Sequence, residues 1–418
     1  MSPFVELILI LAILITAAKT AGYISYRLGQ PSVLGELIAG VILGPSLIDL
    51  LNLSIFEYDH LSETIHHLGE IGVLLLMFLA GLELHFTDLR KSGKVAAFAG
   101  GLGVFLPLIL GTITGLAFQM SLSESIFMGL VLSATSVSIS AQTLIELKVL
   151  RSRVGISLLG AAVFDDVLVV LGLSIFSALA MASSPGGWQS IFWIVFRMLI
   201  FLSLAIVIGT YTFSPLSRFV NKLPISQGLV ALSMVLMLLY GWAAEEIGQM
   251  AAITGAFLAG LLLAQSPVKE KIEQGIASMA FGFFVPVFFI DVGLRANIRA
   301  IGVDTFLFFG AMVLVAIIGK IIGSGAGALF GGLSRRESLQ LGIGMMSRGE
   351  VGLIVASVGI TEGLITQSIY SAVIGVVVIT TLLTPPFLRA SFSTNKSKSE
   401  PPSKSKESAA SNTPGFHQ

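Results

Sequence analysis

The chain lacks cysteine and is poor in charge, because only 11% of its 418 residues are Asp, Glu, Lys or Arg, against roughly one quarter in typical soluble domains. Without cysteine there are no disulfide bonds, and the redox compartment does not follow from the sequence. The 24 basic and 24 acidic residues cancel, so no basic surface for nucleic acid is indicated. No basic cluster precedes the first apolar run, which indicates a first membrane span rather than a cleaved secretory signal.

Metal-ligand and nucleotide-phosphate motifs are also missing, so the sequence supports neither metalloenzyme chemistry nor ATP-driven pumping, and no cofactor is expected. Apolar residues dominate instead, making up 55% of the chain and giving a mean hydropathy of +0.93. The chain is predicted to be an all-α polytopic membrane protein with about thirteen transmembrane helices. The predicted spans lie near residues 4–25, 31–51, 69–85, 95–118, 126–146, 154–182, 190–213, 226–246, 250–265, 275–294, 302–332, 338–360 and 367–388. The ninth span is short, and the eleventh is long enough to be tilted or broken.

Lysine and arginine gather in alternate loops, and short loops rich in these residues stay on the cytoplasmic side of a membrane. These loops contain Arg27; Arg90, Lys91 and Lys94; Lys148, Arg151 and Arg153; Arg218 and Lys222; Lys269 and Lys271; Arg335 and Arg336. The opposite loops lack Lys and Arg, except for Arg295 and Arg299. The N-terminus is therefore predicted outside and the C-terminus in the cytoplasm. Residues 391–418 are predicted to form a disordered cytoplasmic tail that is solvated or touches anionic lipid.

Two adjacent aspartates, Asp165 and Asp166, lie in the middle of the sixth predicted span, in the apolar stretch GISLLGAAVFDDVLVVLGLSIFSALA. A carboxylate at membrane depth is costly, and two neighbouring carboxylates repel each other. Such a pair persists where it meets a cation or a proton. The pair is the strongest indication of function in the sequence.

Polar residues interrupt two other predicted spans. The twelfth contains GIGMMSRGEVGL, with Arg348 and Glu350 on either side of Gly349, and the fifth contains LSATSVSISAQT, with mid-membrane hydroxyls on Ser133, Thr135, Ser136, Ser138 and Ser140. Paired interrupted helices in two inverted halves indicate the ion site of a transporter, because unwound carbonyls and hydroxyls replace part of a cation's water shell. The alternative is that these hydroxyls bond to their own helix backbone.

The other intramembrane charges are matched to these features. Lys320 lies about a dozen residues inside the eleventh span, too deep to reach water easily. We expect it to pair with one of the two aspartates, either in proton coupling or as a purely structural ion pair. Arg348 and Glu350 are expected to compensate the helix ends at the break, together with Glu83 of the GLELHF segment, rather than to bind the ion directly.

Two other functional classes fit parts of this pattern. An ion channel also lines a polar path with Asp, Thr and Ser, but it needs no buried lysine opposite an aspartate and its flux is not coupled to protons. An intramembrane aspartyl protease also uses two membrane aspartates, but its carboxyls face one another across a water. Neighbours in one helix point about 100° apart, so the residues favour a transporter.

Seven segments in consecutive order resemble a known family: QPSVLGELIAGVILGPS, LGEIGVLLLMFLAGLELHFTDLR, GLVLSATSVSIS, AEEIGQMAAITGAFLAGLLLA, PVFFIDVGL, MMSRGEVGLIVA and TTLLTPPFLR. From about residue 5 to residue 390 the chain resembles the second family of monovalent cation:proton antiporters. The resemblance implies a transmembrane exchanger domain over residues 1–390 with two inverted repeats and two crossing unwound helices. It also implies a core bundle (about 69–182 and 302–388) and a scaffold (about 4–51 and 190–294) that forms a homodimer in a bacterial-type plasma membrane or another energy-coupling membrane.

By position in these motifs, Asp166 resembles the ion-binding carboxylate and Asp165 the neighbour that pairs with a lysine, here Lys320. The first unwound segment is matched by Thr135 and Ser136, and the second by Arg348 and Glu350. The adjacent aspartates resemble the electrogenic sodium/proton branch, which implies exchange of Na⁺ or Li⁺ for H⁺ by alternating access and no enzyme activity. The alternative is K⁺/H⁺ antiport or K⁺ efflux, although the chain lacks the Gln-Asp pair and nucleotide-binding domain of the potassium efflux branch.

Two features stand outside this pattern. Asp291 occupies a position where the family has a small or neutral residue, and is interpreted as a charge of the outer mouth near Arg295. The outer loop at 57–67 contains His60, His66 and His67, which either sense acidity or are incidental members of a solvated loop.

Overall fold

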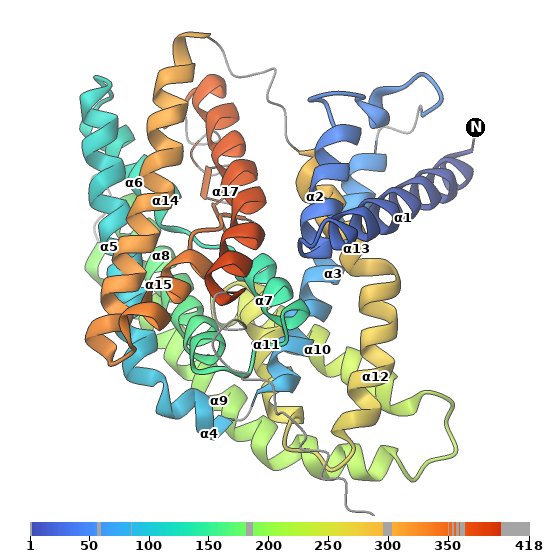
Figure 1. The fold of residues 1–418 in the computed structure, drawn as a ribbon. Helices are drawn as coiled ribbons and strands as arrows, with labels where there is room; N and C mark the ends of the chain where they lie inside the picture. The colour runs from blue at the N-terminus through green and yellow to red at the C-terminus, as the bar shows by residue number, and fades with distance from the viewer. Residues whose placement is uncertain are drawn as a thin grey trace, which may run out of the picture.

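A computed structural model describes residues 2–56, 60–84, 86–180, 187–295, 303–349, 351–352, 355–356, 359 and 364–393. The predicted tail at 391–418 lies outside these residues from 394 onward, and residues 391–393 end the last helix. Within the described ranges the chain is helical and has no strand, which confirms the predicted all-α class (Figure 1). The helices are α1 Pro3–Arg27, α2 Ser32–Leu43, α3 Leu61–Glu83, α4 Phe86–Lys91, α5 Gly93–Ala117, α6 Leu122–Ser133, α7 Val137–Glu146, α8 Arg153–Ala180, α9 Gly187–Val220, α10 Gly228–Glu246, α11 Ala252–Leu263, α12 Lys269–Met279, α13 Val285–Leu294, α14 Val303–Gly331, α15 Arg335–Gly344 and α17 Gln367–Ser393, with short turns at Leu50–Asn52 and Ala280–Phe284.

Each of the thirteen predicted spans overlaps helix in the described residues, and the twelfth, 338–360, does so only in part. Among the described residues, ten helical stretches are long and apolar enough to cross a membrane, and α2 and α11 are shorter apolar helices. The eleventh predicted span is not broken, because α14 runs continuously over 29 residues. The tenth contains a π-helical turn, Ala280–Phe284, which ends two residues before Pro286. Proline has no N–H to donate along the helix, so one backbone hydrogen bond is missing at this position. The looser π-helical turn lies at the same place.

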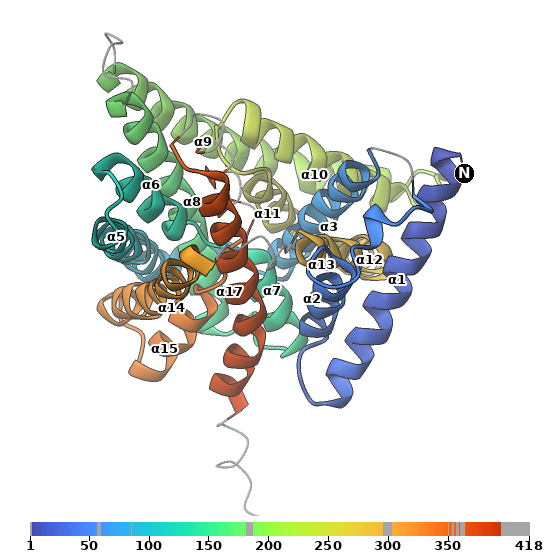
Figure 2. The ribbon, with the colours of Figure 1, turned by 90° about the horizontal axis from the view of Figure 1, so that it is seen from above.

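The helices form two groups, and α7 of the first group and α11 of the second lie at the boundary between them (Figure 2). In the first group α5 packs against α6, α8 and α14, and α14 also packs against α15 and α17. In the second group α13 packs against α1, α2 and α3, while α11 packs against α3 and α10. The long helix α9 contacts α8 of the first group and α10 and α11 of the second. Helices that are far apart in the sequence therefore lie next to one another at the boundary between the two groups.

The position of α3 differs from the predicted domain division. A core bundle starting at about residue 69 would include most of this helix, but α3 packs against α11 and α13. Glycine is the physical reason, because a Cβ on Gly81 would lie 2.2 Å from the Phe257 carbonyl oxygen and a Cβ on Gly260 would lie 2.0 Å from that of Phe78. Backbones this close hold α3 and α11 as one packed unit. We therefore place the boundary between core and scaffold after α3.

One polar contact joins the two groups at the ends of their helices. The Ser32 backbone N–H, at the start of α2, donates to the Glu146 carboxylate at 2.7 Å, and the Ser32 hydroxyl donates to the same carboxylate at 2.5 Å. The Gln142 amide also donates to Glu146 at 2.9 Å. The last turn of α7 is thus attached to the first turn of α2, where free N–H groups favour a negative charge.

Glycines spaced four apart hold other helix pairs at close range. A Cβ on Gly40 of α2 would meet the carbonyl oxygen of Ile290 of α13 at 2.3 Å. A Cβ on Gly327 of α14 would meet that of Phe98 of α5 at 2.2 Å. Close backbone approach replaces hydrophobic driving force between helices in lipid, where apolar side chains gain little by leaving one apolar medium for another.

Replacing Gly327 with leucine should destabilise the protein by about 1 to 3 kcal/mol, because α5 and α14 would be forced apart. Unfolding of the detergent-solubilised protein, followed by tryptophan fluorescence, measures the effect. The control is Gly101→Leu on α5, where an added Cβ meets nothing within 4 Å. Equal losses in the two variants would contradict the packing argument.

Candidate functional site

Two interrupted helices cross at the centre of the first group, as predicted for the fifth and twelfth spans. The helix α6 ends at Ser133, Ala134 and Ser136 have extended ψ values of 142° and 116°, and α7 begins at Val137. The second interruption follows the end of α15 at Gly344, and residues 345–349 are not helical. Both breaks are buried, which is where a membrane protein tolerates unwound backbone.

The two unwound segments satisfy part of each other's backbone. The Ser136 N–H donates to the carbonyl oxygen of Ser347 at 2.9 Å, and the Ser347 hydroxyl donates back to the carbonyl oxygen of Ser136. The Ser140 hydroxyl donates to the last carbonyl of α15, on Gly344. A Cβ on Gly349 would lie 2.5 Å from the Ser136 side chain, so glycine is required at this crossing. The hydroxyl of Thr135 is buried at the break and has no hydrogen-bond partner.

Arg348 lies at the second break and neutralises carbonyl groups. Its guanidinium donates to the carbonyl oxygens of Met346 at 2.9 Å and Ala316 at 2.8 Å, and its side chain is 1% exposed. The Thr381 hydroxyl donates to the Arg348 carbonyl at 2.7 Å. The Met346 carbonyl follows the end of α15, where the helix has a partial negative charge that a buried cation compensates, whereas Ala316 belongs to α14.

The two other residues proposed for this compensation are placed differently. Glu350 lies outside the described residues. Glu83 ends α3 and pairs with Arg151, with 3.8 Å between its Oε2 and the Arg151 Nε. Within the described part of the chain, the structure therefore brings Glu83 to Arg151, near the start of α8, and not to Arg348.

Asp165 and Lys320 form an ion pair inside the first group. The Lys320 ammonium on α14 donates to Asp165 Oδ1 on α8 at 2.6 Å, and both side chains are fully buried. The second carboxylate oxygen, Oδ2, has no hydrogen-bond partner. Of the two aspartates considered as partners for Lys320, the structure selects Asp165. A pair so far from water depends on each member keeping its partner.

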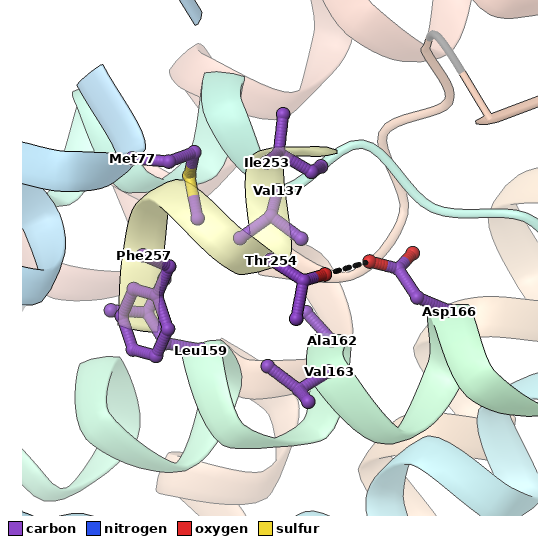
Figure 3. A pocket seen from close by; sticks show the side chains of 9 residues that line it. All are labelled: Met77, Val137, Leu159, Ala162, Val163, Asp166, Ile253, Thr254 and Phe257. Carbon is purple, nitrogen blue, oxygen red and sulfur yellow. Dashed lines mark hydrogen bonds between the residues drawn. The ribbon is translucent and has the colours of Figure 1, made fainter. Parts of the chain in front are cut away.

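The side chain of Asp166 points in a different direction from that of Asp165, because successive residues of a helix lie about 100° apart around its axis. It is 4% exposed and accepts a hydrogen bond from the Thr254 hydroxyl of α11 at 3.3 Å (Figure 3). It lines a cavity together with Met77, Val137, Leu159, Ala162, Val163, Ile253, Thr254 and Phe257. The free space is about that of a single water molecule. The cavity lies between α7 and α8 on one side and α3 and α11 on the other.

Sequence reasoning missed Thr254. The residue lies in the segment AAITGAFLAGLLLA, which was noticed only as a family motif, and its hydroxyl is 2% exposed. One threonine in an apolar helix of 12 residues is a weak signal, because such hydroxyls usually bond to their own helix. Only the approach of α11 to α8 makes it part of the site.

Asp291 and the outer histidines form a separate charged cluster. The Asp291 carboxylate lies 3.0 Å from His66 Nδ1 and 3.1 Å from Arg295 Nε, in agreement with the expected neighbour Arg295. The predicted loop at 57–67 is helical from Leu61, so His66 and His67 belong to α3. Both contact Glu70, one turn further along, at 3.3 and 3.1 Å. Pairs with this spacing stabilise a helix.

Comparisons with known proteins show the family and the fold. A family model described as "Sodium/hydrogen exchanger, transmembrane" matches residues 10–390. The chain is 36% identical over 384 residues to the Na(+)/H(+)-K(+) antiporter GerN of Bacillus cereus, covering 91% of this chain and 95% of that protein. It is 35% identical over 384 residues to a Na(+)/H(+) antiporter of Enterococcus hirae, covering 92% and 97%. The solved structure of the sodium proton antiporter MjNhaP1 from Methanocaldococcus jannaschii at pH 8 superposes with a TM-score of 0.62 at 19% identity, covering 93% and 97%, which shows a shared fold.

Replacing Lys320 with alanine should destabilise the protein by about 3 to 5 kcal/mol, because Asp165 would remain buried without a counter-charge. The double variant Lys320→Met/Asp165→Leu, which removes both charges, should regain most of that loss. Unfolding in detergent measures the three proteins side by side. A double variant as unstable as the single one would contradict the ion-pair argument.

Proposed function

The chain belongs to the sodium/hydrogen exchanger family, and we propose that it exchanges Na⁺ or Li⁺ for H⁺ by alternating access. It is a multi-pass integral membrane protein and a secondary transporter, not an enzyme. Exchange of K⁺ for H⁺ is a second candidate, because the name of the relative GerN includes K(+) as well as Na(+).

One observation carries the proposal. Asp166 lines a cavity with room for one small ion, and its neighbour Asp165 is held by the buried Lys320. A dehydrated monovalent cation needs several oxygen atoms in place of water. We assign these to Asp166, to Asp165 when it is released from Lys320, and to the first break, where Thr135 has a buried free hydroxyl and Ser136 lies at the crossing.

Competition for this site couples the two ions. Two adjacent carboxylates repel each other, and either a cation or protons cancel the repulsion, so one ligand excludes the other. A site that has released its cation and has not yet rebound protons holds two charged carboxylates with no counter-charge, and is costly to move past the apolar walls formed by Met77, Ile253 and Phe257. Only the cation-loaded and protonated forms change sides, and exchange results.

Lys320 sets the proposed stoichiometry. In the cation-free protein its ammonium holds Asp165, and a cation that attracts Asp165 breaks this pair. Lys320 then gives up a proton, as does Asp166, so two protons leave for each Na⁺ that binds. Exchange on these terms moves net charge across the membrane.

Alternating access is proposed to be a movement of the first helix group against the second. The cavity lies at their boundary, so a small relative movement exposes Asp166 to one side of the membrane or the other. We further propose that the second group forms a homodimer, that the N-terminus lies outside and the C-terminus in the cytoplasm, and that the membrane is a bacterial-type plasma membrane or another energy-coupling membrane.

Substituting Asp166→Asn should abolish coupled exchange, because an amide has no charge to share between cation and proton. Proteoliposomes with an acid-loaded lumen and an internal pH dye measure proton efflux after external Na⁺, Li⁺ or K⁺ is added. The matched control is Asp49→Asn, on the turn after α2, where the side chain binds Asn52. Retained coupled exchange in the Asp166 variant would overturn the site assignment, and the order of the three rates identifies the cation.

Membrane voltage should change the exchange rate of the wild-type protein. In proteoliposomes loaded with Na⁺, a potential negative inside should accelerate exchange, because two protons enter for each Na⁺ that leaves. The double variant Asp165→Asn/Lys320→Gln should exchange one for one and lose this response. Exchange by the wild type that is independent of voltage would contradict the stoichiometry while leaving antiport itself intact.

A further inference from the structure

The hydrogen bond between Thr254 and Asp166 crosses the boundary between the two helix groups. Asp166 belongs to α8 of the first group, and Thr254 lies in the first turn of α11, which packs with α3 in the second. Both side chains are almost completely buried, at 2% and 4% exposure. The bond is therefore a direct link between the ion-binding carboxylate and the part of the protein against which it is proposed to move (Figure 3).

Among the described residues that line the cavity, Thr254 is the only one of the second group that carries a side-chain oxygen. The other second-group residues there are Met77, Ile253 and Phe257, which offer nothing to a hard cation such as Na⁺. On the first-group side, the only side-chain oxygens at the cavity belong to Asp166 itself. A cation bound to Asp166 on this face of the cavity can therefore be coordinated by one hydroxyl, that of Thr254.

A threonine hydroxyl can serve the empty and the loaded site in turn. In the present geometry it donates its proton to the Asp166 carboxylate. Thr254 also lies one helical turn after Ala251, whose carbonyl accepts the Thr254 backbone N–H at 2.9 Å. By rotating its proton toward this carbonyl, the hydroxyl turns a lone pair to the cavity. Bonds of threonine hydroxyls to their own helix carbonyls are common and occur in this protein at Thr112 and Thr143.

We propose that Thr254 is a cation ligand present in only one of the two access states, so that the affinity for the cation differs between the two sides of the membrane. The inference rests on the proposed function, because it requires the cation to bind at Asp166. When the first group moves, Asp166 leaves α11 and loses this oxygen, while the ligands at the first break move with it. Thr254 thereby strengthens cation binding on one side and favours release on the other.

The first test is a comparison of Michaelis constants in proteoliposomes. Thr254→Val, which keeps the shape and removes the hydroxyl, should raise the KM for Na⁺ about tenfold, the size expected for one lost bond to a charged group, with Vmax changed less than twofold. Thr254→Ser should restore the wild-type KM. The control Thr112→Val removes a hydroxyl that bonds only its own helix. A KM of Thr254→Val equal to that of the wild type, or a serine variant that behaves like valine, would overturn the proposal.

The second test asks whether the effect belongs to one access state. The chain has no cysteine, so Ser32→Cys/Glu146→Cys introduces the only two thiols, at the contact between α2 and α7. A short thiol cross-linker should hold this arrangement, and Na⁺-dependent thermal stabilisation then reports binding. Thr254→Val should need about tenfold more Na⁺ in the cross-linked protein and a smaller excess without cross-linking, where both states contribute. An equal shift in both would show a ligand of both states and overturn the proposal.

Asp166→Asn in the same cross-linked background separates the two hypotheses. If this variant loses Na⁺-dependent stabilisation while Thr254→Val binds like the wild type, the role of Thr254 fails and the proposed site stands. If Asp166→Asn still binds Na⁺ like the wild type, the proposed site itself fails, and with it the inference about Thr254.

Discussion

The ion pair between Lys320 and Asp165 is the interaction on which the site depends. Its 2.6 Å contact is buried completely, so neither charge can be given up without leaving the other in a medium that solvates it poorly. This coupling ties α8 to α14 and directs one of two adjacent aspartates away from the cavity. The other, Asp166, is left to face the cavity. The pair thus divides the two carboxylates into one bound to an amine and one available to an ion.

The crossing of the two unwound segments allows interrupted helices to exist inside a membrane. Interrupted helices expose carbonyl and N–H groups at a depth where water cannot satisfy them. Here Ser136 and Ser347 satisfy each other's backbone, and Arg348 donates to the carbonyl oxygen of Met346, two residues after the end of α15. The hydroxyl of Thr135 stays free. The bland expectation that the hydroxyls bond their own helix holds for Ser133 and Thr143, yet the residues at the break itself bond across it.

The cavity combines the proposed ion site with the boundary along which the two helix groups are proposed to move. Its walls come from both helix groups, and the second contributes mainly apolar side chains. Glycines bring the backbones of α3 and α11 into close contact within the second group, and among the described residues Thr254 of α11 donates a hydrogen bond to Asp166 of α8. Close packing within each group and weaker contact between the two groups are what a transporter with rigid moving parts needs.

Much of this protein is determined by its sequence alone. Runs of apolar residues predict the thirteen spans, and hydroxyl and charged residues within two of them predict the interruptions, because lipid tolerates polar groups and unwound backbone only under strict conditions. The same reasoning finds Asp165, Asp166 and Lys320, and the family resemblance assigns the lysine to Asp165, as the structure shows. Tertiary structure alone decides the grouping of α3 with α11, the partner of Glu83 and the place of Thr254. The physical reason is that a charged residue in an apolar span is energetically unfavourable whatever its partner, so it can be recognised from the sequence alone. A contact between two residues depends instead on how two distant helices are packed.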